Sequence, residues 1–98
     1  VIDAKAYHKM ASVFLDVEVE PCKLDSVAKI LTQINEVAIV SQHTGTAGLH
    51  VHIYIDNIAN LSRYLEKNIY PIDGVKNIQA QILIRQYKTN TYLANYNE

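Results

Sequence analysis

This chain of 98 residues is poor in cysteine, in excess charge and in long apolar runs, and each shortage excludes a class of protein. A single cysteine, Cys22, excludes an internal disulfide and a cysteine-rich zinc site, and it suits a reducing compartment. Nine Lys and Arg residues against ten Asp and Glu residues leave no basic surface that would bind nucleic acid strongly. No apolar run approaches the roughly 20 residues that a bilayer-spanning helix needs.

The first residues, Val-Ile-Asp-Ala-Lys, lack the charged and apolar regions of a secretion signal. We therefore expect a soluble, cytoplasmic protein with no membrane partner. The length fits one domain, which buries roughly two-thirds of its unfolded surface and gains from a partner that covers more apolar area. Because the first residue is valine, a module N-terminal to this chain has to be considered.

Two stretches alternate between apolar and polar residues, as strands with one buried face do. The first covers residues 11–20 and ends at a proline, and the second covers residues 49–55. A β-branched run at residues 37–40 precedes the second stretch, and a Thr-Gly turn separates them. Because Gly45 and Gly48 allow positive φ or a bulge, we expect an antiparallel hairpin here.

Apolar residues recur at helical spacing in two further stretches. Residues 23–35 predict an amphipathic helix of three to four turns. A second helix follows Asp56 or Asn57, either of which can cap it, and it stops at Pro71. Residues 75–87 alternate again and predict the last strand. The element order is therefore β-α-β-β-α-β.

This order predicts an α+β fold, a ferredoxin-like sandwich in which two helices cover one face of a four-stranded antiparallel sheet. On the covered face we expect a filled core that includes Ile82 and Ile84. The other face is too apolar for solvent and too polar for a core, so we predict a dimer that stacks sheet on sheet as a dimeric α/β barrel. The candidate dimer-interface residues are Phe14, Asp16, Glu18, His50, His52, Tyr54, Leu83 and Arg85, with Gln79 and Gln81 on the same face.

Three motifs follow one another in a distinctive order along this pattern. Residues 21–27, Pro-Cys-Lys-Leu-Asp-Ser-Val, open the first helix, and Thr44-Gly45 forms the hairpin turn. Residues 71–75, Pro-Ile-Asp-Gly-Val, precede the last strand. Together they resemble the C-terminal ligand-binding and oligomerisation (RAM) domain of the Lrp/AsnC family of transcription regulators.

The resemblance implies a domain organisation and a function. Residues 10–88 form the effector-binding and oligomerisation domain, after a linker or N-terminal extension (1–9) and before a C-terminal tail (89–98). The implied partners are a second copy in a homodimer, further copies in a tetramer or octamer, and a small effector, an amino acid or related metabolite, at contacts between subunits. DNA is bound only through a separate N-terminal module, which does not fit inside residues 1–10. We predict no enzymatic activity, no cofactor and no metal.

The chain departs from the family pattern in the hairpin and in the last strand. The acidic residue that follows Thr-Gly in the family falls at Gly48, and an aromatic residue falls at Ala47. A buried ammonium without a partner costs on the order of several kcal/mol, so the missing carboxylate indicates either a different effector or none. The candidate effector residues that the resemblance implies are Thr44, Gly45, Thr46, Ala47 and Gly48, with Ala80 and Gln81 where the family often has small hydroxyl residues.

The same residues also suggest other chemistry. His50 and His52 share a strand face, and with Asp16 or Glu18 they suggest a metal site, although no third ligand is conspicuous. The same imidazoles would alternatively make assembly sensitive to pH. The two carboxylates lack an accompanying nucleophile, which argues against acid–base catalysis, and Cys22 is a passive residue beside a proline.

Three other functions compete with that of a regulatory domain. A dimeric α/β-barrel enzyme, such as a cofactor-independent monooxygenase, needs a cavity between sheet and helices, where we expect a filled core. A stand-alone amino-acid sensor resembling ACT domains shares the topology but not the placement of the Thr-Gly and Pro-x-x-Gly-Val motifs. An RNA-binding sheet needs paired aromatics beside basic residues on the central strands. The Thr-Gly turn itself serves either chain geometry or a ligand.

Overall fold

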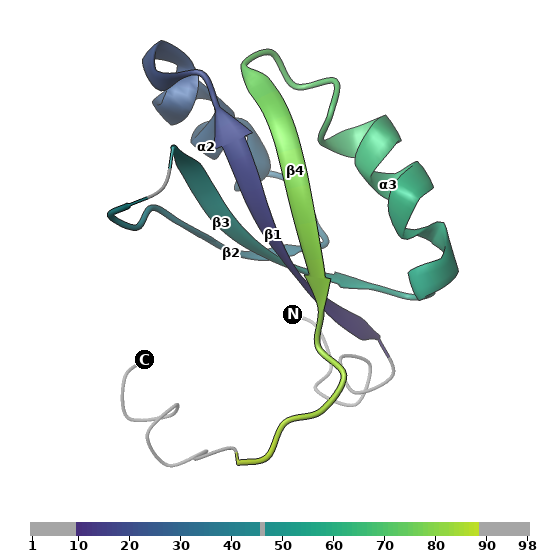
Figure 1. Cartoon of the computed structure of the whole chain (residues 1–98). Coiled ribbons are helices and arrows are strands. Elements are labelled where there is room, and N and C mark those ends of the chain that lie inside the picture. Colours follow the sequence, from purple (N-terminus) through teal and green to yellow (C-terminus); the bar gives the residue numbers. More distant parts are fainter. Residues whose placement is uncertain (1–9, 46, 89–98) are drawn as a thin grey trace.

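The computed structural model describes residues 10–45 and 47–88, and its element order is the predicted one. One antiparallel sheet has the strand order β2-β3-β1-β4, and two helices lie on one of its faces (Figure 1). This is the ferredoxin-like α+β sandwich expected from the sequence. The strands are β1 (Ala11–Val19), β2 (Val37–Ser41), β3 (Gly48–Ile55) and β4 (Val75–Ile82). The helices are α2 (Leu24–Leu31) and α3 (Leu61–Asn68), which follow the 3₁₀ turns η1 (Pro21–Lys23) and η2 (Ile58–Asn60).

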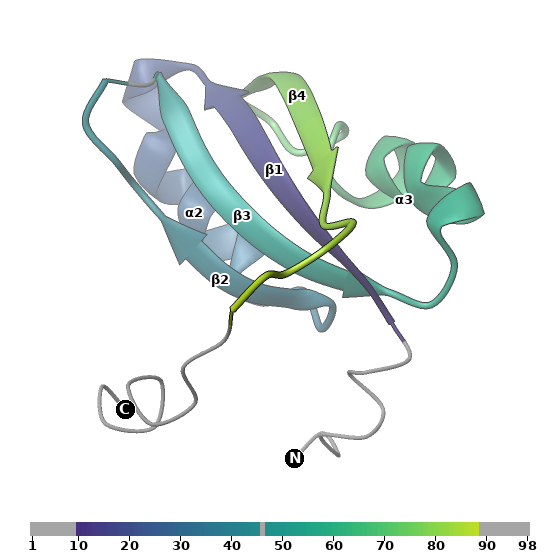
Figure 2. The same ribbon diagram turned by 60° about the horizontal axis from the view of Figure 1, so that its bottom comes forward.

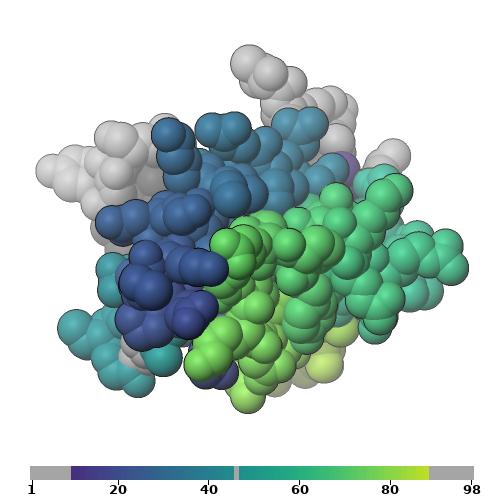
Figure 3. Space-filling model, turned by 90° about the horizontal axis from the view of Figure 1, so that it is seen from above, coloured from purple at the N-terminus to yellow at the C-terminus, as the bar shows by residue number. Residues whose placement is uncertain are grey.

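The core lies between the sheet and the helices. In β1 and β3 every second residue is buried, as the period-2 alternation predicts. The side chains of α2 and of the connection after α3 meet on the helical side, where Figure 3 shows them in blue and green. Each buried Leu or Ile contributes about 1.5–3 kcal/mol. The core residues are Val13, Leu15, Val17, Val19, Val27, Leu31, Leu49, Val51, Ile53, Ile55, Leu65, Ile69 and Ile78.

The first helix is shorter than the predicted residues 23–35. The hydroxyl of Thr32 donates to the carbonyl of Lys29 at 2.7 Å, and the N–H of Gln33 donates to the carbonyl three residues before it. These bonds tighten the chain into a turn, which ends the helix after about two turns and leads into β2. Ile34 still packs against the core, so its place in the apolar pattern did not require a helical conformation.

The last strand is also shorter than predicted, because β4 pairs only with β1 and ends near the start of that strand. The N–H of Leu83 donates to the Ser12 carbonyl at 3.0 Å. Residues 83–88 then leave the sheet as an irregular segment (Figure 1 and Figure 2). Two core predictions are therefore wrong: Ile84 is 93% exposed, and Ile82, at the open edge of the sheet, is 46% exposed. Leu83 and Arg85 belong to this segment and not to the strand face on which they were expected.

The carboxyl end of β1 is held from both sides. The N–H of Val19 donates to the Ala47 carbonyl in the hairpin at 3.2 Å, and the N–H of Glu20 donates to the Gly74 carbonyl at 2.9 Å. Gly74 has φ +106°, a conformation that favours glycine. Hairpin, β1 and the α3–β4 connection thus meet at one end of the sheet. The candidate site lies at this end.

Candidate functional site

The uncovered face of the sheet brings together side chains from three neighbouring strands. Because β1 lies between β3 and β4, each outward residue of β1 has a neighbour on both sides. The antiparallel registers therefore place these residues in rows across the sheet, each with one residue of β1 in the middle. The rows are Gly48–Glu18–Asn77, His50–Asp16–Gln79 and His52–Phe14–Gln81.

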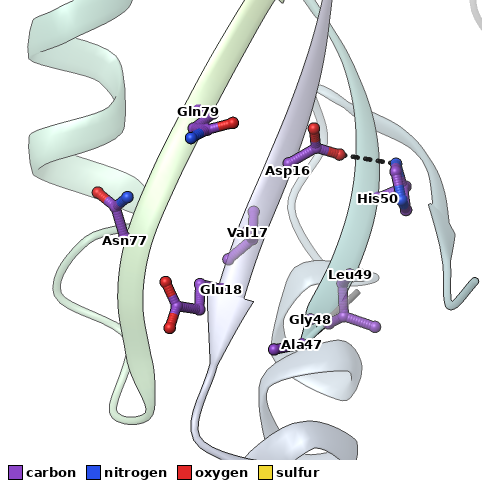
Figure 4. Close-up of a pocket in the computed structure, with 9 residues that line it drawn as sticks. All are labelled: Asp16, Val17, Glu18, Ala47, Gly48, Leu49, His50, Asn77 and Gln79. Atoms are coloured by element: carbon purple, nitrogen blue, oxygen red, sulfur yellow. Dashed lines mark ion pairs between the residues drawn. The ribbon is translucent and has the colours of Figure 1, made fainter. Parts of the chain in front are cut away.

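The first two rows line an open pocket of about 200 Å³ at the hairpin end of the sheet (Figure 4). Carboxylates of Asp16 and Glu18 stand in its middle, and the amides of Asn77 and Gln79 stand on the β4 side. On the β3 side the Nδ1 atom of His50 lies 2.7 Å from an oxygen of Asp16. The pocket is also lined by Val17, Ala47, Gly48 and Leu49.

The hairpin approaches β1 most closely at Gly48, which is buried. A Cβ atom placed on this residue would lie 1.8 Å from the carbonyl oxygen of Val17, far inside van der Waals contact. Glycine is therefore required at this position by the close approach of the two strands. The position where the family resemblance leads one to expect an acidic residue has no room for a side chain, and the carboxylate of Glu18 lies in the directly opposite residue of β1.

Histidines continue the face away from the pocket. The ring of His52 stacks on Phe14 with centroids 4.3 Å apart, and its Nε2 is hydrogen-bonded to the hydroxyl of Ser12. Burial lowers the pKa of His52 below the ordinary value for histidine, because the charged ring loses hydration. His50 meets the ring of His43 at 4.4 Å. The imidazoles of this face therefore already have partners within the chain.

The structure brings together only some of the residues proposed for an effector site. Ala47 and Gly48 line the pocket, whereas Ala80 and Gln81 lie further along β4 and do not line it. Ala80 pairs with the buried Leu15 and so faces the helices, while Gln81 faces outward beside Phe14. Thr44 and Gly45 form an exposed turn in which Gly45 has φ +86°. Thr46 lies outside the described residues.

The interface candidates divide in the same way. Six of the candidates are outward residues of β1 and β3 and share the open face. They are Phe14, Asp16, Glu18, His50, His52 and Tyr54. Leu83 and Arg85 follow β4, where Arg85 stands 5.6 Å from the ring of Tyr87.

Sequence reasoning missed Asn77 and did not connect Gln79 with the pocket. The alternation in β4 places both on one face, but only the strand register shows that they lie opposite Glu18 and Asp16. That register includes a bulge between Glu18 and Val19, which no sequence pattern announces. Ile39 and Ser41 of β2 were missed for a similar reason, and they line a second pocket of about 240 Å³ with Phe14 on the same face.

Metal binding finds no support in the described ranges. Within residues 10–45 and 47–88, no three His, Cys, Asp or Glu side chains are grouped so that they would hold a metal ion. His50 instead contacts Asp16, and His52 bonds Ser12. In the same ranges, no helix has the length and hydrophobicity that crossing a bilayer requires.

Comparison with known proteins gives one family. Residues 12–93 match the family model described as the Lrp/AsnC ligand binding domain. An uncharacterized HTH-type transcriptional regulator of Pyrococcus furiosus is 29% identical over 79 residues, which are 81% of this chain and 53% of the relative. The chain spans about half the length of the curated relatives it matches, with 53%, 44% and 44% covered.

Solved structures with the same fold include AsnC of E. coli and a transcriptional regulator of Neisseria meningitidis. AsnC of E. coli superposes with a TM-score of 0.79 at 16% identity, over 92% of this chain and 61% of that chain. A transcriptional regulator of Neisseria meningitidis in complex with L-Met superposes with a TM-score of 0.78 at 14% identity, over 93% of this chain and 60% of that chain. At these identities the likeness concerns the fold.

Proposed function

This chain belongs to the family of Lrp/AsnC ligand-binding domains, and on that premise we propose that it is the regulatory domain of a transcription regulator. In this role it binds a small effector, an amino acid or related metabolite, and assembles with further copies of itself. It carries out no catalysis. DNA is contacted only through a separate N-terminal module, and the place of action is the cytoplasm.

The observation that carries the proposal is the pocket beside the hairpin. It combines carboxylates, amides and apolar side chains in a volume of about 200 Å³, which suits one small polar molecule. Ala47 and Gly48, which the family resemblance implicated, line it. The pocket is open on the side that a second subunit would cover. An effector bound here would therefore contact both subunits and bias their arrangement.

Assembly is proposed through the open face of the sheet. In the described part of the chain, Phe14 and Ile39 expose 41% and 54% of their surface there. Two polar side chains of this face, His50 and Asp16, already contact each other, so covering the face does not leave them without partners. Beyond β4, Ile84 and Tyr87 are 93% and 88% exposed, and a second copy is the partner we propose for them.

Two measurements on the whole chain test this proposal. In analytical ultracentrifugation at neutral pH we expect a dimer or a larger assembly, which Phe14→Glu dissociates because it places a charge in the interface. Ile58→Glu is the matched control, since Ile58 is 38% exposed but lies on η2 away from the open face. In a thermal-shift screen of the twenty amino acids, at least one should raise the melting temperature. A monomer that responds to no amino acid would contradict the proposal.

Two alternatives make different predictions. A stand-alone amino-acid sensor would bind and assemble in the same way, but its coding sequence would contain no helix-turn-helix upstream of Val1. A dimeric α/β-barrel enzyme would use a cavity between sheet and helices. The described part of the chain fills that space with buried side chains from β1, β3, α2 and α3, which favours the regulatory function.

A further inference from the structure

The pocket beside the hairpin has a one-sided charge. Two carboxylates and two amides line it, and no Lys or Arg is among its described lining residues. The one other ionisable group, His50, lies 2.7 Å from Asp16 and so is engaged within the chain. A neutral amino acid carries both an ammonium and a carboxylate. This pocket supplies acceptors for the ammonium but no side-chain cation for the carboxylate.

The two carboxylates differ in their contacts within the chain. The Asp16 side chain contacts His50, whereas the Glu18 side chain makes no hydrogen bond or ion pair with another side chain within residues 10–45 and 47–88. Glu18 lies in the row between Gly48 and Asn77, so an amide stands on one side and bare backbone on the other. A ligand therefore reaches this carboxylate without displacing an internal partner.

Gly48 explains why the charge comes from β1. The close approach of a Gly48 Cβ to the Val17 carbonyl, 1.8 Å, leaves no space for an acidic side chain on the hairpin. The negative charge of this residue pair is therefore supplied by Glu18 and not by the hairpin.

We propose that this pocket selects a small organic amine with net positive charge, a basic amino acid or a diamine, and that Glu18 binds its ammonium group. The inference rests on the proposed effector role of the same pocket. Asn77 and Gln79 accept further N–H bonds through their amide oxygens, and Asp16 adds a second negative charge nearby. A charge-assisted hydrogen bond of this kind changes affinity by roughly 10- to 100-fold.

The test is calorimetric titration of the full chain at pH 7.5 with four probes, which are L-lysine, cadaverine, L-norleucine and L-glutamate. Norleucine has the length of lysine without the second ammonium, so it isolates the charge. We expect lysine or cadaverine to bind at least roughly tenfold more tightly than norleucine, and glutamate not to bind. Added salt should weaken lysine binding more than norleucine binding.

A variant locates the contact. Glu18→Gln should weaken the binding of the cationic probe at least roughly tenfold, and more than it weakens the binding of norleucine, which carries a single ammonium. Glu66→Gln, at an exposed position on α3, is the matched control and should leave both unchanged. Equal melting temperatures of the two variants would confirm that both are folded.

The outcomes separate this inference from the function on which it rests. If norleucine binds as tightly as lysine, or Glu18→Gln has no effect on lysine, the charge selection is overturned and the effector site stands. Binding of glutamate alone would also overturn it. If none of these probes and none of the twenty amino acids binds, the proposed effector function itself fails.

Discussion

Replacing Gly48 by alanine tests the tightest contact that the structure contains in its candidate site. The added Cβ would lie 1.8 Å from the Val17 carbonyl oxygen, and real Cβ atoms essentially never approach closer than 3.0 Å. The distance must therefore grow by at least about 1.2 Å (3.0 − 1.8), which separates β3 from β1 at the base of the hairpin. The adjacent Val19–Ala47 backbone bond, already 3.2 Å long, would break.

The expected loss follows from these two effects. Forcing an extra methyl group into a packed site costs about 1–3 kcal/mol. Losing one or two backbone hydrogen bonds adds about 0.5–1.5 kcal/mol for each. We therefore expect Gly48→Ala to lower the free energy of unfolding by roughly 2–5 kcal/mol, and the melting temperature by about 10 °C or more in a chain of this size.

Urea denaturation followed by circular dichroism, at one fixed protein concentration, measures this loss. Gly45→Ala is the matched control in the same hairpin. Its φ of +86° is unfavourable for alanine, but no described residue beyond its two chain neighbours has an atom within 4 Å of the added Cβ, so we expect a loss of only about 1–2 kcal/mol. Gly48→Asp should destabilise at least as much as Gly48→Ala and should not create a binding site. Equal losses at both glycines would refute the close approach of β3 to β1.

Three further predictions concern the core, a cap and a histidine. Leu15→Ala should lower the free energy of unfolding by about 2–5 kcal/mol because Leu15 is 1% exposed, whereas Ile84→Ala, at a 93% exposed position, should change the stability of the monomeric unit by less than about 0.5 kcal/mol. Asn57→Ala should cost about 1 kcal/mol, since the Asn57 side chain accepts a hydrogen bond from the N–H of Ala59 at the start of η2. Thermal denaturation measures all three changes in stability. Because the folded state lowers the pKa of His52, the stability that its neutral ring contributes is complete above about pH 6.5 and declines as pH falls through the lowered value. The urea midpoint of His52→Gln should therefore fall less than that of the wild type between pH 7.5 and pH 5. An equal fall of the midpoint in both proteins would contradict the lowered pKa of His52.

Sequence reasoning predicted the fold because two periods are unambiguous in this chain. The alternation in residues 11–19 and 49–55 decides which face of β1 and β3 is buried, and Asn57 was correctly identified as a possible cap. The ends of elements were less predictable. Thr32 ends α2 through a side-chain bond to its own helix, and β4 ends because its partner strand does. Neither cause is visible in the pattern of apolar residues.

The candidate site was predicted only in part, because it depends on register rather than on local sequence. The family resemblance predicted Ala47 and Gly48 as site residues. Asn77 lies at the pocket because it pairs with Glu18, beside the bulge in β1, and the sequence does not reveal this pairing. The interpretation of Gly48 from the sequence was also incomplete. From the sequence it appears as a missing carboxylate, while the structure shows that the backbone of β1 occupies the space.

The alternation along β1 has an evolutionary consequence. Leu15 and Val17 point into the core, while Asp16 and Glu18 point into the pocket from the same strand. Substitutions at the outward positions leave core packing untouched, so the lining of the pocket can change without loss of foldability. Gly48 is the exception, because its backbone contact serves the hairpin and the pocket together. We expect homologous domains that carry this glycine to vary at the outward positions of β1 and β4 and to retain the hairpin.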